Sequence, residues 1–298
     1  MKSSILVIGS SNTDMVIRAP HLPAPGETIL GGKFLMNAGG KGANQAVAAA
    51  RLGGAVTFIC KTGNDIFGKQ SIQLFKAEGI DTEFIVEDPQ QPSGVALITV
   101  DDNAENCIAV ASGANAYLFP GDLLPATRSI EAAGIILMQL EIPVETVAFV
   151  ASAGANKKII LNPAPASALG DELLKHITII TPNETEASML TGITVTDEAT
   201  AEMAASALHA KGITTVIITL GAKGALVLHE GVYTLVPAPV VKAIDTTAAG
   251  DVFNGALAVA LAENHDMLSS VEFACKAAAL SVTRLGAQAS APYWHELD

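Results

Sequence analysis

The stretch GIILMQLEIPVETVAFVASAGANKKIILN, residues 134–162, combines the two periodicities that decide the fold. Residues 134–140 and 158–162 are apolar runs of strand length, and residues 144–153 between them have the spacing of an amphipathic helix. A strand, a helix and a second strand in this order predict a βαβ unit with two parallel strands.

The same alternation continues outward from this stretch in both directions. It predicts strands at 5–8, 55–60, 177–181 and 215–220, and helices at 42–52, 67–78, 184–190 and 199–211. A hairpin that turns at Glu230 and Gly231 follows, and two Ala-rich helices end the chain. We therefore expect an α/β fold, with a doubly wound, largely parallel central sheet flanked by helices.

Two segments, about 15–35 and 94–112, break the alternation because they contain extended patterns without an intervening helix. They predict β-ribbons, which form either a lid over the carboxyl ends of the central strands or an edge hairpin without a gating role. The sequence contains no repeat, low-complexity stretch or linker. A single domain over residues 1–298 with a small β-sheet lid is the expectation.

Composition excludes several classes of function. A net charge of −13 over 298 residues argues against nucleic-acid and anionic-membrane partners, which would be repelled. The short apolar run near the start is followed by Gly9 and polar residues, so we expect a cytoplasmic protein with neither a signal peptide nor a membrane span. Cys60, Cys107 and Cys275 lack paired spacing, which indicates buried or incidental thiols.

The segment DTTAAGD, residues 245–251, predicts a small-residue turn that opens a helix. Unpaired amides at a helix start bind phosphate, and small side chains allow the phosphate to approach. Asp251 beside them has two interpretations. It either caps the helix or accepts a proton from an attacking hydroxyl group.

A second glycine-rich turn, residues 37–45, also runs into a helix, but it matches neither the dinucleotide fingerprint nor the Walker A motif. Its glycines could admit a polyhydroxylated ligand close to the backbone. Asn12 and Asp14, two residues apart after the first strand, can point to one side of an extended chain and bind sugar hydroxyls. A simple turn explains them equally well.

Three further positions carry alternatives. Asn183 and Glu186 have the spacing of a capping box, although Glu186 could instead order waters around Mg²⁺. Glu141 follows a predicted strand at the sheet edge where ligands bind, which suggests a sugar contact. Lys223 could lie near nucleotide phosphates or in a solvated turn.

Together these motifs resemble the ribokinase family of PfkB-type carbohydrate kinases over essentially the whole chain. The segments that carry the resemblance, besides Glu141, are GSSNTD (9–14), GGKGANQA (39–46), NPAP (162–165), TPNETEA (181–187), TLGAKGA (219–225) and DTTAAGDVFNGAL (245–257). The resemblance implies transfer of the γ-phosphate of ATP to the 5-hydroxyl of D-ribose. It leaves open a related kinase for 2-deoxyribose, a ketose or a nucleoside. A catalytically silent sugar sensor is the alternative from another class, and a nicotinamide-dependent dehydrogenase is a more distant one.

The resemblance also assigns residues, always by motif position. Asp251 becomes the base, and the anion hole is made by Ala248, Ala249 and Gly250. The implied sugar set is Asn12, Asp14, Gly39, Gly40, Lys41, Asn44, Glu141 and Asp251. The implied ATP set is Asn183, Thr219, Leu220, Gly221, Ala222, Lys223, Gly224, Gly250, Asp251 and Cys275.

The implied cofactors are Mg²⁺, held through water by Glu186, and an activating K⁺. The implied K⁺ set is Asp245, Thr247, Ser281, Arg284, Gly286 and Ser290. A homodimer formed through the β-lid is the implied assembly. Two positions depart from the pattern: Ala248 stands where many relatives have Gly, and Cys275 stands where a polar residue is common beside adenine.

Overall fold

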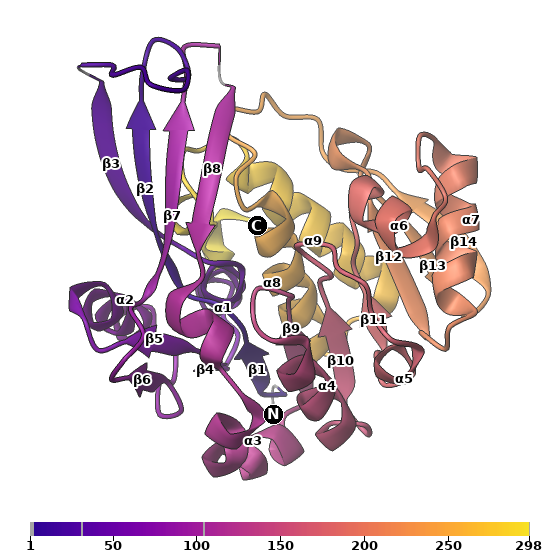
Figure 1. The fold of residues 1–298 in the computed structure, drawn as a ribbon. Coiled ribbons are helices and arrows are strands. Elements are labelled where there is room, and N and C mark those ends of the chain that lie inside the picture. Colours follow the sequence, from indigo (N-terminus) through magenta and orange to yellow (C-terminus); the bar gives the residue numbers. More distant parts are fainter. Residues whose placement is uncertain (1–2, 31, 104, 298) are drawn as a thin grey trace.

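The computed structural model describes residues 3–30, 32–103 and 105–297. Its central sheet has eight strands in the order β14-β13-β12-β11-β10-β9-β1-β4 (Figure 1). The strands from β12 to β4 are parallel, and the hairpin β13–β14 adds two antiparallel strands at one edge. Their bounds are β1 (Ile5–Ile8), β4 (Val56–Ile59), β9 (Ile135–Met138), β10 (Lys158–Leu161), β11 (Ile179–Ile180), β12 (Thr215–Thr219), β13 (Ala225–His229) and β14 (Val232–Val236).

Helices cover both faces of this sheet because its strands are apolar on both sides. In β1, Ile5 and Val7 belong to one buried cluster and Leu6 and Ile8 to the other. The first cluster packs against α1 (Lys41–Arg51), α2 (Ile66–Ala77), α8 (Ala249–Ala262) and α9 (Met267–Ser281). The second packs against α3 (Thr127–Ala132), α4 (Val144–Ala153), α5 (Asp171–Leu174), α6 (Glu184–Thr191) and α7 (Glu198–His209). The predicted doubly wound fold is confirmed.

A separate four-stranded sheet, in the order β3-β2-β7-β8, rises beside one end of the central sheet (Figure 1). Its strands are β2 (Asn12–Arg18), β3 (Lys33–Gly39), β7 (Gly94–Val100) and β8 (Asn106–Ala111). The first ribbon therefore begins at Asn12 and returns to Gly39, beyond the predicted bounds of 15–35. Backbone pairing of Asn12 with Gly39 extends the ladder to the glycine turn, which sequence periodicity could not reveal.

Shorter elements were not predicted from the sequence. β5 (Lys61–Gly63) and β6 (Val86–Asp88) form a two-stranded sheet, and each is too short to show a period of two. In the described part of the chain, 3₁₀ helices span Gly113–Tyr117, Pro120–Ala126, Gly221–Lys223, Gln288–Ser290 and Trp294–Glu296. Within the described ranges, no helix has the length and apolar character needed to cross a membrane.

Candidate active site

The start of α8 places Asp251 in the interior. Ala248 is the N-cap residue, with a left-handed backbone (φ 59°) and no side-chain capping bond. Asp251 lies in the first turn and is buried, with a side chain that accepts hydrogen bonds from another helix. Asn44 Nδ2 donates to its Oδ2 at 2.9 Å, and Gln45 Nε2 donates to its Oδ1 at 3.0 Å. The capping interpretation of Asp251 is therefore wrong.

Close packing of α1 against α8 brings these groups together. A Cβ added to Gly255 would lie 2.8 Å from both the Ala48 side chain and the Gln45 carbonyl oxygen, so only glycine allows the two helices this spacing. Ala48 is one turn after Asn44, and Gly255 is one turn after Asp251. The same small-residue contact thus sets the distance between the Asp251 carboxylate and its amide donors.

Amides at the start of α8 face the expected phosphate position. The Ala249 N–H donates to the Thr246 carbonyl at 3.2 Å and is already engaged. In the part of the chain that the structure describes, the N–H groups of Gly250 and Asp251 make no hydrogen bond. These free amides, at the positive end of a helix of 14 residues, can bind an anion.

The end of β1 contributes a second group of polar side chains. Ser10 Oγ donates to Glu141 Oε2 at 2.5 Å, and the same carboxylate oxygen accepts the Lys41 backbone N–H at 3.1 Å. Asn12 is held by Asn115, whose Nδ2 donates to Asn12 Oδ1 at 2.7 Å. Glu141 therefore joins the ends of β1 and β9 to the start of α1.

Gly39 and Gly40 in the turn have no side chain, and other atoms of the protein pack closely against their backbone. A Cβ on Gly39 would lie 2.2 Å from Asp14 Oδ2, and one on Gly40 would lie 2.7 Å from the Asn12 backbone nitrogen. Gly40 also has a positive φ of 88°. These glycines let the Asn12–Asp14 strand pack against the turn, so that its side chains reach the site. That they also admit a ligand close to the backbone stays a prediction.

Charge accumulates where these groups meet. Burial, with the nearby Glu141 and Asp251 carboxylates, raises the pKa of Asp14 to about 6. Burial also raises the pKa of Asp251, against the opposing effects of Lys41, Asn44 and Gln45. Burial lowers the pKa of Lys41, but Asp251, Glu141 and Glu186 outweigh it and leave that pKa above its ordinary value. Lys41 is thus a retained cation among carboxylates.

Two cavities lie beside this group. One, of about 420 Å³, is lined by Asn12 and Glu141 together with Asn115, Val110 and Pro165. Asp14, Lys41 and Asn44 are outside its lining. They belong to the same electrostatic cluster through Asp251 and Glu141.

The other cavity, of about 320 Å³, is mostly apolar. It brings together six of the ten residues expected at ATP: Thr219, Gly221, Ala222, Gly224, Gly250 and Cys275. Leu220 does not line it, because its side chain packs in the core. Asn183, Lys223 and Asp251 are also outside the lining. Helices α8 and α9 both contribute to this cavity, so Gly250 links it to the Asp251 site.

The predicted capping box at α6 is present. Asn183 Oδ1 accepts the Glu186 N–H at 2.8 Å, and Glu186 Oε2 accepts the Asn183 N–H at 2.9 Å. Burial raises the pKa of Glu186, while the Asn183 hydrogen bond and Lys41 oppose that rise. Only Oε2 is used in the box, so Oε1 is left for a further contact and the two interpretations of this motif are compatible.

Two of the residues expected around K⁺, Thr247 and Gly286, donate backbone hydrogen bonds to Asp245. Its Oδ1 accepts the Thr247 N–H and its Oδ2 the Gly286 N–H, both at 2.9 Å. Burial opposes these bonds, but they lower the pKa of Asp245, which stays charged. The Arg284 guanidinium is instead paired with Glu296, at 2.7 and 3.1 Å. Ser281 and Ser290 use their hydroxyl groups on carbonyls of their own turns.

The structure adds three amide side chains that the sequence reasoning did not assign. Gln45 bonds Asp251, Asn162 bonds Gln45 at 3.1 Å, and Asn115 bonds Asn12. Gln45 and Asn162 stood inside motifs. The available signals were a polar residue on the buried face of a predicted helix for Gln45 and a polar residue at the end of a buried strand for Asn162. Asn115 lies in a 3₁₀ helix with no sequence signal.

Comparison with known proteins explains this combination of sites. The model of the pfkB family of carbohydrate kinases matches residues 2–294. The chain belongs to this family. A ribokinase of Haemophilus influenzae is 48% identical over 98% of this chain and 96% of its own. A deoxyribokinase of Salmonella typhi is 38% identical over 97% of this chain and 95% of its own.

A solved structure of the family has the same fold. The Arabidopsis thaliana ribokinase, complexed with ribose and ATP, has a TM-score of 0.94 and 32% identity, covering 100% of this chain and 98% of that one. That relative holds ribose and ATP on the fold that this chain shares, and this chain has one cavity at the start of α8 and another beside Asn12 and Glu141.

Proposed function

We propose that this protein is a ribokinase, which transfers the γ-phosphoryl group of ATP to O5 of D-ribose with Asp251 as the base. The observation that carries the proposal is the position of this buried carboxylate. It lies between a polar group of side chains suited to a sugar and the free amides of the α8 start, beside an apolar cavity. The similarity to named ribokinases supports ribose as the acceptor.

Asp251 is suited to receive the hydroxyl proton. Burial favours its neutral form, while Lys41 and the two amide donors favour the carboxylate. The net result is a carboxylate that is more basic than that of an exposed aspartate, as a general base requires. Asp251 takes the proton as the sugar oxygen attacks phosphorus, and the Gly250 and Asp251 amides stabilise the charge on the transferred group.

The sugar pocket is formed by polar groups whose hydrogen-bonding capacity is not used within the protein. Asn44 Nδ2 is committed to Asp251, while its buried Oδ1 has no partner among the described residues. An unpaired buried acceptor is costly, so Asn44 Oδ1 accepts a sugar hydroxyl. Asp14 and Glu141 accept hydrogen bonds from further sugar hydroxyls, and Lys41 donates a hydrogen bond. The backbone of Gly39 and Gly40 holds these groups in place.

The apolar cavity accommodates the nucleotide base and ribose. Small residues there, including Gly221, Ala222 and Gly224, allow close approach of a flat ring, and Cys275 replaces a polar contact with a buried thiol. Asn183, Leu220 and Lys223 act from outside the lining, through backbone groups or charge. Mg²⁺ supplies charge neutralisation on the phosphates when bound. Glu186 fits this ion because Oε1 is free to hold its water.

We assign the monovalent-cation loop to the segment around Asp245. The charged Asp245 carboxylate and backbone carbonyls of this loop are the hard oxygen donors that K⁺ needs. The set is Asp245, Thr247, Ser281, Arg284, Gly286 and Ser290, and Arg284 takes part only through its backbone because its side chain binds Glu296. Asp245 and Thr247 directly precede α8, so an ion there would steady the turn that carries the anion-binding amides.

The four-stranded sheet is proposed as both a lid and a dimer contact within a single domain spanning 1–298. Strand alternation places Asn12 and Asp14 on the face toward the site. The opposite face carries the exposed apolar residues Ile17, Phe34, Met36 and Leu97, which share one side in the observed register. A patch of this kind favours a protein partner, and a second copy is the simplest one.

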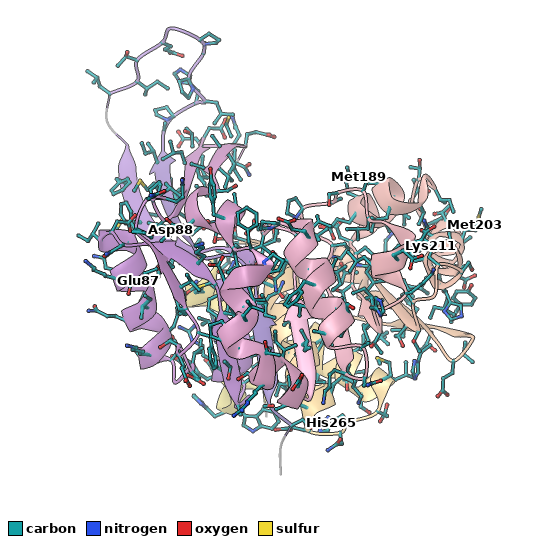
Figure 2. All side chains as sticks on the ribbon, turned by 60° about the horizontal axis from the view of Figure 1, so that its bottom comes forward. Glu87, Asp88, Met189, Met203, Lys211 and His265 are labelled. Atoms are coloured by element: carbon teal, nitrogen blue, oxygen red, sulfur yellow. The ribbon has the colours of Figure 1, made fainter. Side chains whose placement is uncertain are left out.

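This lid patch is separate from the exposed methionines of α6 and α7. Met189 and Met203 lie on the opposite side of the molecule (Figure 2). We place the homodimer on the lid and not on those helices. We also propose a cytoplasmic location, since the reaction consumes ATP.

A sugar panel tests the function. The purified protein is assayed for ATP consumption with ribose, 2-deoxyribose, fructose and adenosine, with and without potassium. Ribose is expected to give the highest kcat/KM. The similarity to a deoxyribokinase makes 2-deoxyribose the main competitor, and a preference for it would replace the acceptor while leaving the mechanism in place. Ribose binding by calorimetry without any phosphorylation would instead favour a sugar sensor.

A further inference from the structure

Among the described residues, two side chains donate hydrogen bonds to Asp251, and of these Gln45 has no assigned role in the proposed reaction. It lies in the second turn of α1 and is fully buried. Its Nε2 donates to Asp251 Oδ1 at 3.0 Å and to Asn162 Oδ1 at 3.1 Å. Its Oε1 accepts Gln139 Nε2 at 2.6 Å. Both N–H groups of the amide and its carbonyl oxygen are therefore committed.

The orientation of this amide is fixed by its neighbours. Asn162 Nδ2 donates to the Thr181 carbonyl at 3.2 Å, which leaves Asn162 Oδ1 as an acceptor toward Gln45. A flipped Gln45 would put its carbonyl oxygen against two acceptor oxygens, those of Asn162 and Asp251. The network thus points a donor at Asp251 at a buried position, where such a hydrogen bond is stronger than in water.

We propose that Gln45 is a positioning residue that anchors Oδ1 of Asp251, keeps the carboxylate ionised and leaves Oδ2 to receive the sugar hydroxyl proton. This inference rests on the proposed function. Asn44 supports the choice of oxygen, since it bonds Oδ2 and presents its own unpaired Oδ1 beside it. In the step, the sugar O–H bond breaks and its proton goes to Oδ2, while the sugar oxygen forms the new bond to the γ-phosphorus. The bond from that phosphorus to the β–γ bridging oxygen breaks, and ADP leaves with the electron pair.

A hydrogen bond to the charged form of a buried acid lowers its pKa, and burial here acts in the opposite direction. Loss of the Gln45 donor is therefore expected to raise the pKa of Asp251. Hydrogen bonds to charged groups have strengths that correspond to a shift of about 1 to 2 pH units. Because the base must be ionised, the acid limb of kcat/KM moves to higher pH by that amount.

The test uses Gln45→Met, which keeps the side-chain length but removes the donor, and Gln45→Glu, which keeps a polar group of the same size. Gln45→Met is expected to lower kcat by about 10- to 100-fold with a small change in the KM for ribose. Both variants are expected to shift the acid limb upward, the second because a like charge faces Asp251. Gln288→Met makes the same change at another buried glutamine and is expected to leave the pH profile unchanged.

Circular dichroism and urea unfolding first establish which variants fold. A folded Gln45 variant with the wild-type acid limb would overturn the inference, whatever its kcat. If the wild type itself did not phosphorylate ribose, the proposed function would fail separately. The inference would then be decided by ¹³C NMR of aspartate-labelled protein, with the Asp251 signal assigned from Asp251→Asn. A higher carboxyl pKa in the Gln45 variants supports it, and an unchanged pKa refutes it.

Discussion

Replacing Asp14 with asparagine is expected to stabilise the fold and to weaken sugar binding at the same time. The Asp14 carboxyl binds its proton more tightly in the folded protein, where its pKa is about 6, than at its ordinary pKa of 3.8. Its contribution to stability is therefore fully present below pH 3.8 and is lost as the pH rises through about 6. The amide of the Asp14→Asn variant does not ionise, so the variant avoids this loss.

The size of the effect follows from the gap between the two pKa values. Proton linkage gives a gain of up to about 3 kcal/mol in the free energy of unfolding at pH 7. At pH 5 the folded carboxyl is mostly protonated, and the expected gain falls to about 1.6 kcal/mol. Loss of the charged acceptor is expected to weaken ribose binding by about 10- to 100-fold.

Urea unfolding of both proteins at pH 7 and pH 5 measures the first effect, and calorimetry with ribose measures the second. Glu87→Gln is the control, because this carboxylate is exposed on β6 (Figure 2) and its change should leave stability nearly unaltered. An Asp14→Asn protein no more stable than the wild type at pH 7 would refute the electrostatic reasoning. A gain that grew toward pH 5 would do the same.

Four further outcomes are expected. Asp251→Ala should lower kcat by about 10²- to 10⁴-fold while ribose binding changes little, and near-normal ATP consumption would exclude this base. Light scattering should give the wild-type protein and the control Met203→Asp twice the chain mass of 30.5 kDa, and Phe34→Asp the mass of one chain. A monomeric wild-type protein would contradict the lid contact. Ala248→Gly should raise the free energy of unfolding by about 0.5 to 1 kcal/mol, because it relieves a left-handed alanine at the cost of greater chain entropy, whereas Ala249→Gly should lower it. Replacing sodium with potassium in the assay should increase kcat several-fold, and equal rates in the two salts would contradict the proposed cation site.

Local pattern was sufficient for most of the fold. Continuous apolar runs predicted the strands that became β1, β4, β9, β10, β11 and β12, because burial of both sheet faces leaves a strong apolar signal. Helical spacing predicted α1, α2, α4, α6 and α7 between them. Local pattern failed where an element was too short, as in β5 and β6. It also failed where pairing extended a strand into a polar segment, as at Asn12.

For the candidate site, too, the sequence predicted some features and not others. Motif order suggested Asp251, Asn12, Asp14 and Glu141 as functional, and a helix start with small residues was visible at 245–251. From the sequence, Asp251 could be either a helix cap or a catalytic base, because the type of a residue does not reveal its hydrogen-bond partner. Its two amide donors lie 206 and 207 positions away along the chain.

The sequence by itself thus determined the α/β alternation, the glycine turns and the kind of chemistry that each segment could support. Only the tertiary structure decided which groups meet: Gly255 against Ala48 brings α1 to α8, and the Gln45 amide then faces the Asp251 carboxylate. The physical reason is that periodicity encodes which face of an element is buried. The distance between two side chains depends instead on how closely the elements that carry them pack.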